Sequence, residues 1–423
     1  MVSPRDQPNT VPPIASPAPS DAVDRRAVLL ARVETAVQEI NAAQEALGTL
    51  QLEQPLVRRV RGRLDGVFDR KREQMLGLAR AVRAAQPDGA EPALSEEWGN
   101  YTRLDAELRP VHQECLAFIE GVLVRGQRLD RGICEVADGL LYELKRRCGV
   151  SWDRFTILAE GELFGELAGV IKLRFPALDV WDLPVAAHEL GHMAAPALET
   201  DAGAKPFATL LQTQRAPIDV PPGATYDAYL HEHFADVFAT YTMGASYAAV
   251  CLLLRFDAAA AHVDGERHPA ANRRAHVILR TLARLDPETS ISRPFSAVAG
   301  RLRQHWVAAL AEAGLEPELP QAERNRLDEL EDELVGILDE TLDAEGRYRV
   351  QWWRNAEDIA DALERTDASA PQATDELIAD VLNGAWLYRL PLNRDMESLR
   401  SAARQARERS AAITRRRYDD EGS

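Results

Sequence analysis

The sequence has few cysteines, and they are not arranged as a framework. Four occur among the 423 residues, and no two of them form a Cys-x-x-Cys pair. A chain of this length can fold without disulfides, so these thiols are expected to be reduced and mostly buried. The residues concerned are Cys115, Cys134, Cys148 and Cys251.

Long hydrophobic runs are also missing. The longest lies near the stretch YAAVCLLLRF and has about ten residues, whereas a helix needs about 20 apolar residues to cross a bilayer. The first 20 residues, MVSPRDQPNTVPPIASPAPS, contain no apolar segment of the kind found in signal peptides. We therefore expect a cytoplasmic protein without a membrane partner.

Basic residues are fewer than acidic residues. The chain has 50 Lys and Arg against 67 Asp and Glu, which gives a formal net charge of −17. An acidic surface is repelled by nucleic-acid phosphates and by anionic lipid headgroups. The composition thus argues against nucleic acid as a partner. Hydrophobic residues make up 46% of the chain, enough for two or three folded domains of roughly 150 residues each.

Composition and periodicity divide the chain into four regions. Residues 1–21 are rich in Pro, Ser and Ala and are expected to be disordered. Residues 22–129 show helical periodicity, which predicts an N-terminal helical bundle or hairpin. Residues 130–286 form the region with candidate catalytic residues, and residues 287–423 are helical again. The fold class expected is mainly α (α+β), with a small β-sheet in the third region.

Local patterns refine this division. The segments WDRFTILAE (152–160) and AGVIKLRFP (168–176) are rich in β-branched and aromatic residues and predict strands. A long helix is predicted over residues 225–254 and another from about His268 to Arg284. An acidic run at 323–342 and a basic run at 399–418 are interpreted as solvated helix faces, which would also be able to contact each other or another subunit.

The stretch PVAAHELGHMAAP (184–196) contains the clearest chemical motif. Four residues turn a helix by about 400°, so His188 and His192 point the same way, about 6 Å apart. That separation suits two corners of a tetrahedral zinc site. Glu189 is rotated by about 100° from His188, where a general base reaches a zinc-bound water without binding the metal. The apolar residues on both sides predict a buried helix.

A catalytic zinc takes three protein ligands and keeps one position open. The scheme H-E-x-x-H-x-x-G-x-x-H fails, because Ala195 and Leu198 stand where it requires Gly and His. Asp201 is a conceivable oxygen ligand from the following loop. Glu232 is the better candidate, with Asp236 one helical turn later on the same face. Asp236 would accept the second N–H of a ligating histidine and fix its tautomer.

His188-Glu189-Leu190-Gly191-His192, followed by Glu232 and Asp236, resembles the motif of the gluzincin, or thermolysin-like, zinc metallopeptidases. The resemblance covers roughly residues 130–285. It implies a zincin-like domain that binds Zn²⁺, with a peptide or protein as substrate. It implies that His188, His192 and Glu232 bind the metal. It also implies that Glu189 is the catalytic base and acid, and that Asp236 forms a hydrogen bond to one of the ligands.

The resemblance has two further implications. The strand before the active helix, in residues 168–176, would line the cleft and bind the substrate as an added β-strand. A downstream His or Tyr would stabilise the oxyanion of the reaction.

His268 is the main candidate for that role, although a surface histidine that caps a helix before Pro269 has the same sequence pattern. Tyr226 and Tyr229 are alternatives. The neighbouring histidines and the remaining tyrosine are expected to have structural roles. His231 and His233 are expected on the helix surface, and Tyr241 is expected in the core.

Three hypotheses about function follow. The first is a zinc-dependent metallopeptidase whose helical flanks restrict access or receive a regulatory partner or a second copy of the chain. The second is a zincin-like module that binds metal and partners without catalysis. The third is a helical scaffold in which the motif is fortuitous, and it predicts that Glu232 lies far from His188.

Overall fold

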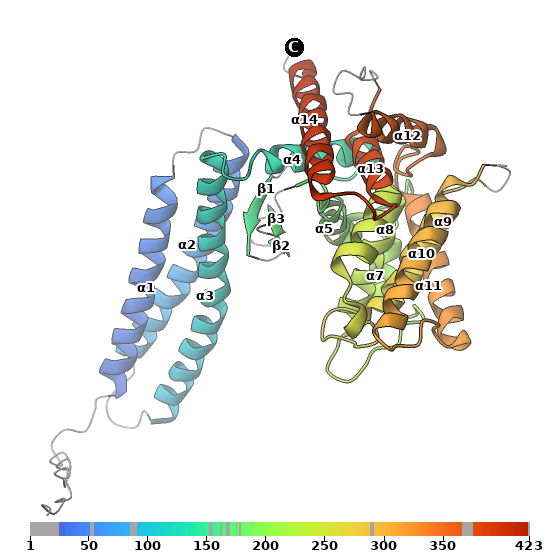
Figure 1. The fold of residues 1–423 in the computed structure, drawn as a ribbon. Coiled ribbons are helices and arrows are strands. Elements are labelled where there is room, and N and C mark those ends of the chain that lie inside the picture. The colour runs from blue at the N-terminus through green and yellow to red at the C-terminus, as the bar shows by residue number, and fades with distance from the viewer. Residues whose placement is uncertain are drawn as a thin grey trace, which may run out of the picture. The chain divides into compact units, whose positions relative to one another are not determined.

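The computed structural model describes residues 25–50, 55–84, 91–151, 155–160, 163–165, 170–174, 176, 179–287, 292–365 and 375–421. Within these residues the chain is mainly helical and has one small sheet, which confirms the mainly α expectation (Figure 1). No helix among them is long and apolar enough to cross a membrane. The tail predicted to be disordered, residues 1–21, lies outside the described part of the chain.

Two compact units make up the chain. The first contains residues 1–51 and 62–115, and the second contains residues 52–61 and 116–423. Three helices contribute to the first unit, where the sequence predicted a bundle or hairpin. They are α1 (Arg25–Thr49), α2 (Pro55–Ala84) and α3 (Glu91–Gly126).

Hydrophobic periodicity explains how the helices of the first unit associate. The buried positions of α1 recur every three to seven residues and include Leu29, Val33 and Ile40. Such a stripe makes one helix face apolar and drives its burial against neighbouring helices. Ion pairs link the polar edges, with Arg83 of α2 bound to Glu34 of α1 at 2.7 Å.

The second unit contains a three-stranded sheet. Two strands lie where the sequence predicted them, β1 (Thr156–Ala159) and β3 (Val170–Arg174), and the three-residue β2 (Leu163–Gly165) was missed. The strand order is β1-β3-β2, with β1 parallel and β2 antiparallel to β3. A three-residue strand is too short to produce a recognisable alternation in the sequence.

This order corrects the prediction that residues 168–176 bind substrate as an added strand. Ile171 of β3 is paired with Thr156 on one side and with Phe164 on the other. The backbone of a central strand already uses its hydrogen-bonding groups for its neighbours, so only an edge strand can accept another chain. The edges of this sheet belong to β1 and β2.

Helix α4 (Ile133–Cys148) contacts β1 and ends as predicted. Gly149 follows it with φ 68°, after three basic residues in the last turn of the helix. The helix with the His-Glu motif is α5 (Val185–Ala194), which continues into the short 3-10 turn η1 (Ala195–Ala197). The long connection that follows contains α6 (Pro206–Thr213).

The long helix predicted over residues 225–254 is interrupted. It consists of α7 (Tyr226–Met243), α8 (Ala245–Val250) and the π-helical segment η2 (Cys251–Arg255). Gly244 separates α7 from α8 with φ 69° and ψ −140°, and a β-carbon there would lie 2.8 Å from the ring of Tyr348. Neither the backbone angles nor the space at this position admits a side chain.

The C-terminal helices belong to the same unit as the region with the motif. Their hydrophobic residues join one core that runs from Ile133 to Ile413, so the core does not end at the predicted boundary near residue 286. The short 3-10 turn η3 (Ala258–Ala260) precedes them in the chain. The helices are α9 (Ala271–Arg284), α10 (Pro294–Glu312), α11 (Gln321–Thr341), α12 (Val350–Glu364), α13 (Ile378–Arg389) and α14 (Met396–Glu421).

Polar contacts join α13 and the segment before α12 to α7. The backbone N–H of Tyr348 donates to the carbonyl of Tyr241, and the Asn383 side chain donates to the carbonyl of Met243. The core of segment 130–286 thus includes hydrophobic residues of the helices from α10 to α14.

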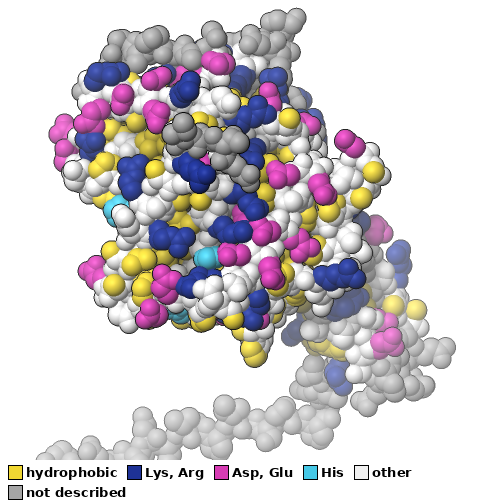
Figure 2. Space-filling view, turned by 90° about the vertical axis from the view of Figure 1, so that its right-hand side faces the viewer, with side chains coloured by type: hydrophobic (Ala, Val, Ile, Leu, Met, Phe, Trp, Pro, Cys, Tyr) yellow, Lys and Arg dark blue, Asp and Glu magenta, His cyan; other side chains and the backbone are white. Residues whose placement is uncertain are grey.

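The interpretation of the two charge runs as solvated faces is wrong for several residues. Glu331, in the acidic run, is fully buried and forms an ion pair with Arg280 of α9. In the basic run, Arg409 pairs with the buried Glu376, and Arg417 pairs with the buried Glu143 at 2.8 Å. On the face shown in Figure 2, acidic and basic side chains are mixed.

Candidate metal centre

Helices α5 and α7 approach each other closely at a glycine. A β-carbon on Gly191 would lie 3.0 Å from the α-carbon of Ala235 and 3.2 Å from the ring of Phe238. Small residues at such a crossing allow two helix backbones to come together. The approach brings the inward face of α5, with His188 and His192, opposite Glu232 of α7.

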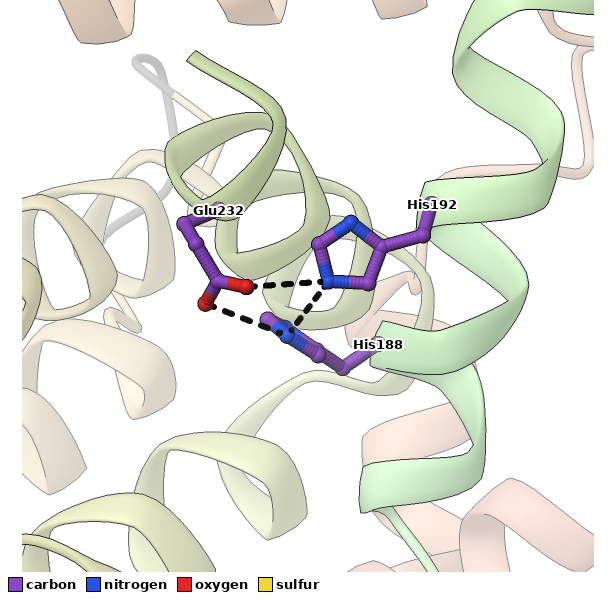
Figure 3. A group of neighbouring side chains, drawn as sticks. All are labelled: His188, His192 and Glu232. Carbon is purple, nitrogen blue, oxygen red and sulfur yellow. Dashed lines mark hydrogen bonds and ion pairs between the residues drawn. The ribbon is translucent and has the colours of Figure 1, made fainter. Parts of the chain in front are cut away.

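These three side chains form a cluster (Figure 3). The Nε2 atoms of His188 and His192 lie 3.0 Å apart. His188 Nε2 is 3.6 Å from Oε2 of Glu232, and His192 Nε2 is 3.3 Å from Oε1. Ligand atoms bound to tetrahedral zinc at about 2.0–2.1 Å are about 3.3 Å from one another. The spacing of the cluster therefore fits a single small cation.

The hydrogen bonding of the cluster also fits a metal. Glu232 is only 7% exposed, and its Oε2 atom is buried without a hydrogen bond. Buried carboxylate oxygens without a hydrogen bond are rare, because desolvation costs free energy that only a bound partner offsets. The Arg274 guanidinium, 3.1 Å from this oxygen, offsets part of the cost through its charge, and a cation between the two imidazoles and the carboxylate would add a further partner.

The electrostatic environment favours positive charge at this position. Burial opposes ionisation of His188, but the nearby Asp236 and Glu232 carboxylates outweigh it and raise its pKa to about 10. Burial opposes ionisation of Glu232 as well, but Arg274 and the histidines hold its pKa well below the ordinary value. The cluster thus stabilises a cation, either a proton or a metal ion.

Asp236 lies behind the cluster and is fully buried. Its Oδ1 atom is 3.2 Å from Nδ1 of His188, so the two side chains that the motif predicts to interact are adjacent. Arg274 binds both carboxylate oxygens of Asp236, at 2.7 and 2.8 Å, and lies 3.1 Å from Oε2 of Glu232. Burial raises the pKa of Asp236, but Arg274 outweighs it and lowers that pKa below its ordinary value.

Two residues of this arrangement were not among the predicted site residues. Arg274 belongs to α9, and Tyr247 of α8 places its hydroxyl 2.9 Å from Nδ1 of His188. Both are too far along the chain from Glu232 and Asp236 for one regular helix to bring the side chains into contact, so the packing of the helices reveals them.

A cavity of about 1190 Å³ opens onto the cluster. Glu189 lines the same cavity as His188, His192 and Glu232, so an acidic residue outside the cluster borders the same space. Other lining residues are Arg174, Val185, Met193, Phe256 and Arg267. A metal held by the three side chains would be accessible to a ligand from this cavity.

His268 is at the cavity as well. Its Nε2 atom lies 3.4 Å from Oε1 of Glu232, while 63% of its side chain is exposed. Asp201 is exposed and lies outside both the cluster and the cavity lining. The structure thus places five of the six predicted site residues at the cavity. The sixth, Asp236, lies behind them.

Of the three other histidine and tyrosine residues with a predicted location, two are placed differently from the prediction. His233 was expected on the helix surface but is buried, and burial lowers its pKa to about 4. His231 is half-buried against the ring of Phe207 and lines the cavity. Tyr241 is in the core, as expected.

The alternative tyrosines are directed elsewhere. The hydroxyl of Tyr226 accepts a hydrogen bond from the backbone of Ala216, and that of Tyr229 donates to the carbonyl of Gly265. Neither residue lines the cavity.

The hypothesis of a fortuitous motif predicts a long distance between His188 and Glu232, whereas Nε2 and Oε2 of these residues are 3.6 Å apart.

Comparisons of the chain with protein-family models, with curated proteins and with solved structures found no match. The function must therefore be inferred from the site itself.

Proposed function

We propose that this protein is a zinc-dependent hydrolase that cleaves peptide bonds. The observation that carries the proposal is the convergence of two imidazoles and one carboxylate on an open cavity that Glu189 also lines. Two His and one Glu with a free coordination position is a ligand set used by catalytic zinc in peptidases. Imidazole and carboxylate ligands also suit zinc, whereas Cu(I) and iron–sulfur clusters prefer thiolates, which this cluster lacks.

The residues would divide the chemistry as follows. Zinc bound to His188, His192 and Glu232 would supply Lewis acidity toward the scissile carbonyl. Glu189 would accept a proton from the attacking water and deliver it to the leaving amine. His268, exposed beside Glu232, would donate a hydrogen bond to the oxygen on which negative charge develops.

The dimensions of the cavity support a peptide rather than a small metabolite. Its volume of about 1190 Å³ exceeds the roughly 300–1,000 Å³ of ordinary small-molecule pockets. Its walls combine apolar side chains such as Val185 and Phe256 with the arginines 174 and 267. An extended peptide presents both apolar side chains and polar backbone to such walls.

The decisive experiment measures metal content. Purified wild-type protein is equilibrated with zinc and freed of excess, and the same is done for Glu232→Ala and for Glu266→Ala, which removes a carboxylate of the cavity wall outside the cluster. We expect about one zinc per chain in the wild type and in Glu266→Ala, and a sharp loss in Glu232→Ala. A wild type without zinc would refute the proposal.

Hydrolysis is then assayed with a library of peptides. Cleavage that requires the bound zinc supports the peptidase. Stable zinc binding with no cleavage of any peptide would leave the metal site but replace the proposed activity by that of a metal-binding module.

A further inference from the structure

We propose that Tyr247 is a positioning residue that orients His188 for the metal, an inference that rests on the metal site of the proposed function. The Tyr247 hydroxyl contacts both of the groups that the motif expects to interact directly. It is 2.9 Å from Nδ1 of His188 and 2.6 Å from Oδ1 of Asp236.

Chemistry fixes the direction of these hydrogen bonds. Both oxygens of Asp236 accept hydrogen bonds from Arg274, so this side chain is an acceptor here. Tyr247 therefore donates its O–H to Asp236, and its oxygen accepts from the Nδ1–H of His188. With the proton on Nδ1, the lone pair of Nε2 faces His192 and Glu232, where the metal would bind.

The direct contact between His188 and Asp236 is the weaker of the two. Nδ1 and Oδ1 are 3.2 Å apart, an ion-pair distance, while the hydrogen bond of Nδ1 runs to Tyr247 at the shorter distance of 2.9 Å. Asp236 thus contacts the histidine both directly and through the phenol.

The break at Gly244 is what brings Tyr247 to this place. In an uninterrupted helix, 11 residues separate two positions by about 16 Å along the axis. The change of direction between α7 and α8 instead places the Tyr247 hydroxyl 2.6 Å from Asp236. The same turn stacks the Tyr247 ring on that of His188, with 13° between the ring planes.

A role as a packing residue makes a different prediction. Tyr247 is 1% exposed, and its ring packs in the core. Phenylalanine retains that packing and removes only the hydroxyl. If Tyr247 were structural alone, Tyr247→Phe would leave the metal site unchanged.

The experiment compares Tyr247→Phe with Tyr241→Phe. Tyr241 is also a core tyrosine with a carboxylate partner, Asp339, but it lies outside the cavity lining. Zinc affinity is measured by competition with a chromogenic chelator. We expect Tyr247→Phe to bind zinc about 10- to 100-fold more weakly, the usual effect of losing a partner of a ligating histidine. Tyr241→Phe should stay within about twofold of the wild type.

A second measurement separates orientation from stability. The visible spectrum of the cobalt-substituted protein, recorded on the monodisperse folded fraction, reports the geometry of the ligands. We expect the bands to change in Tyr247→Phe and not in Tyr241→Phe.

Wild-type zinc affinity together with a wild-type cobalt spectrum in Tyr247→Phe would overturn the role of Tyr247 and leave the proposed site intact. A wild type that binds no zinc would instead overturn the site itself, and this inference with it.

Discussion

Gly191 of α5 lies so close to Ala235 of α7 that a β-carbon on the glycine would come within 3.0 Å of the alanine α-carbon. His188 and His192 flank Gly191 in the sequence, and Glu232 is less than one turn before Ala235. The separation of the two helices at this crossing therefore sets the distances among the three side chains of the cluster.

Gly191→Ala should push the helices apart. We expect it to destabilise the fold by about 1–3 kcal/mol, as overpacking does, and to lower the zinc content. Gly300→Ala is the control, because Gly300 is in the middle of α10 with open space around it, and alanine there should stabilise by about 0.5–1 kcal/mol. Chemical denaturation and metal analysis measure both effects. Equal stability of the two variants would contradict the close crossing.

Glu189→Gln should retain zinc and lose hydrolysis. The amide has nearly the same shape but cannot accept the proton of the attacking water, so we expect at least about a 100-fold lower kcat. Glu266→Gln, on the cavity wall, is the matched control and should remain active. Normal cleavage by Glu189→Gln would show that the base has been assigned incorrectly.

His268→Ala should lower kcat by about 100- to 1,000-fold while the zinc content remains unchanged, as expected for the loss of an oxyanion donor. His262→Ala is the control, since His262 is exposed on the same loop and its ring contacts the carbonyl of Glu316. Unchanged turnover of His268→Ala would make His268 a surface residue. Loss of zinc would make it a ligand.

Zinc should raise the melting temperature of the wild-type protein. Ligand that binds only the folded state stabilises it by about 2.7 kcal/mol when its free concentration is about 100 times Kd. Differential scanning calorimetry with zinc and with a chelator measures the shift. Glu232→Ala should show no comparable shift, and a shift of the same size in that variant would place the bound metal elsewhere.

The stability of the second unit should depend on the protonation of Asp380. Burial raises the pKa of this carboxyl to about 7, with the nearby Glu143 acting in the same direction and with hydrogen bonds from Asn355 and Tyr348 opposing. A folded-state pKa above the ordinary 3.8 means that the stabilisation is complete below about pH 4 and is lost as the pH rises through about 7.

We therefore expect the free energy of unfolding of Asp380→Asn to fall less steeply between pH 4 and pH 7 than that of the wild type. Denaturation at a series of pH values gives both slopes. Asp361→Asn, at an exposed position of α12, should keep the wild-type slope. Parallel curves for the wild type and Asp380→Asn would contradict the raised pKa.

The residues of the candidate site that are neighbours on a helix were predictable from the sequence. His188 and His192 share a face because four residues make slightly more than one helical turn, and the same holds for Glu232 and Asp236. The strands β1 and β3 were predictable for a similar reason, since their residues favour extended backbone over a short local range. These features depend only on residues close together in the chain.

The tertiary structure alone decided the rest. β3 became the central strand because β2, too short to recognise, pairs along its second side. Tyr247 and Arg274 reach Asp236 from 11 and 38 residues away, through the break at Gly244 and the packing of α9. The helices after residue 286 closed the core of the site's own unit. Such contacts depend on how whole elements pack, and the order of residues within one helix does not encode them.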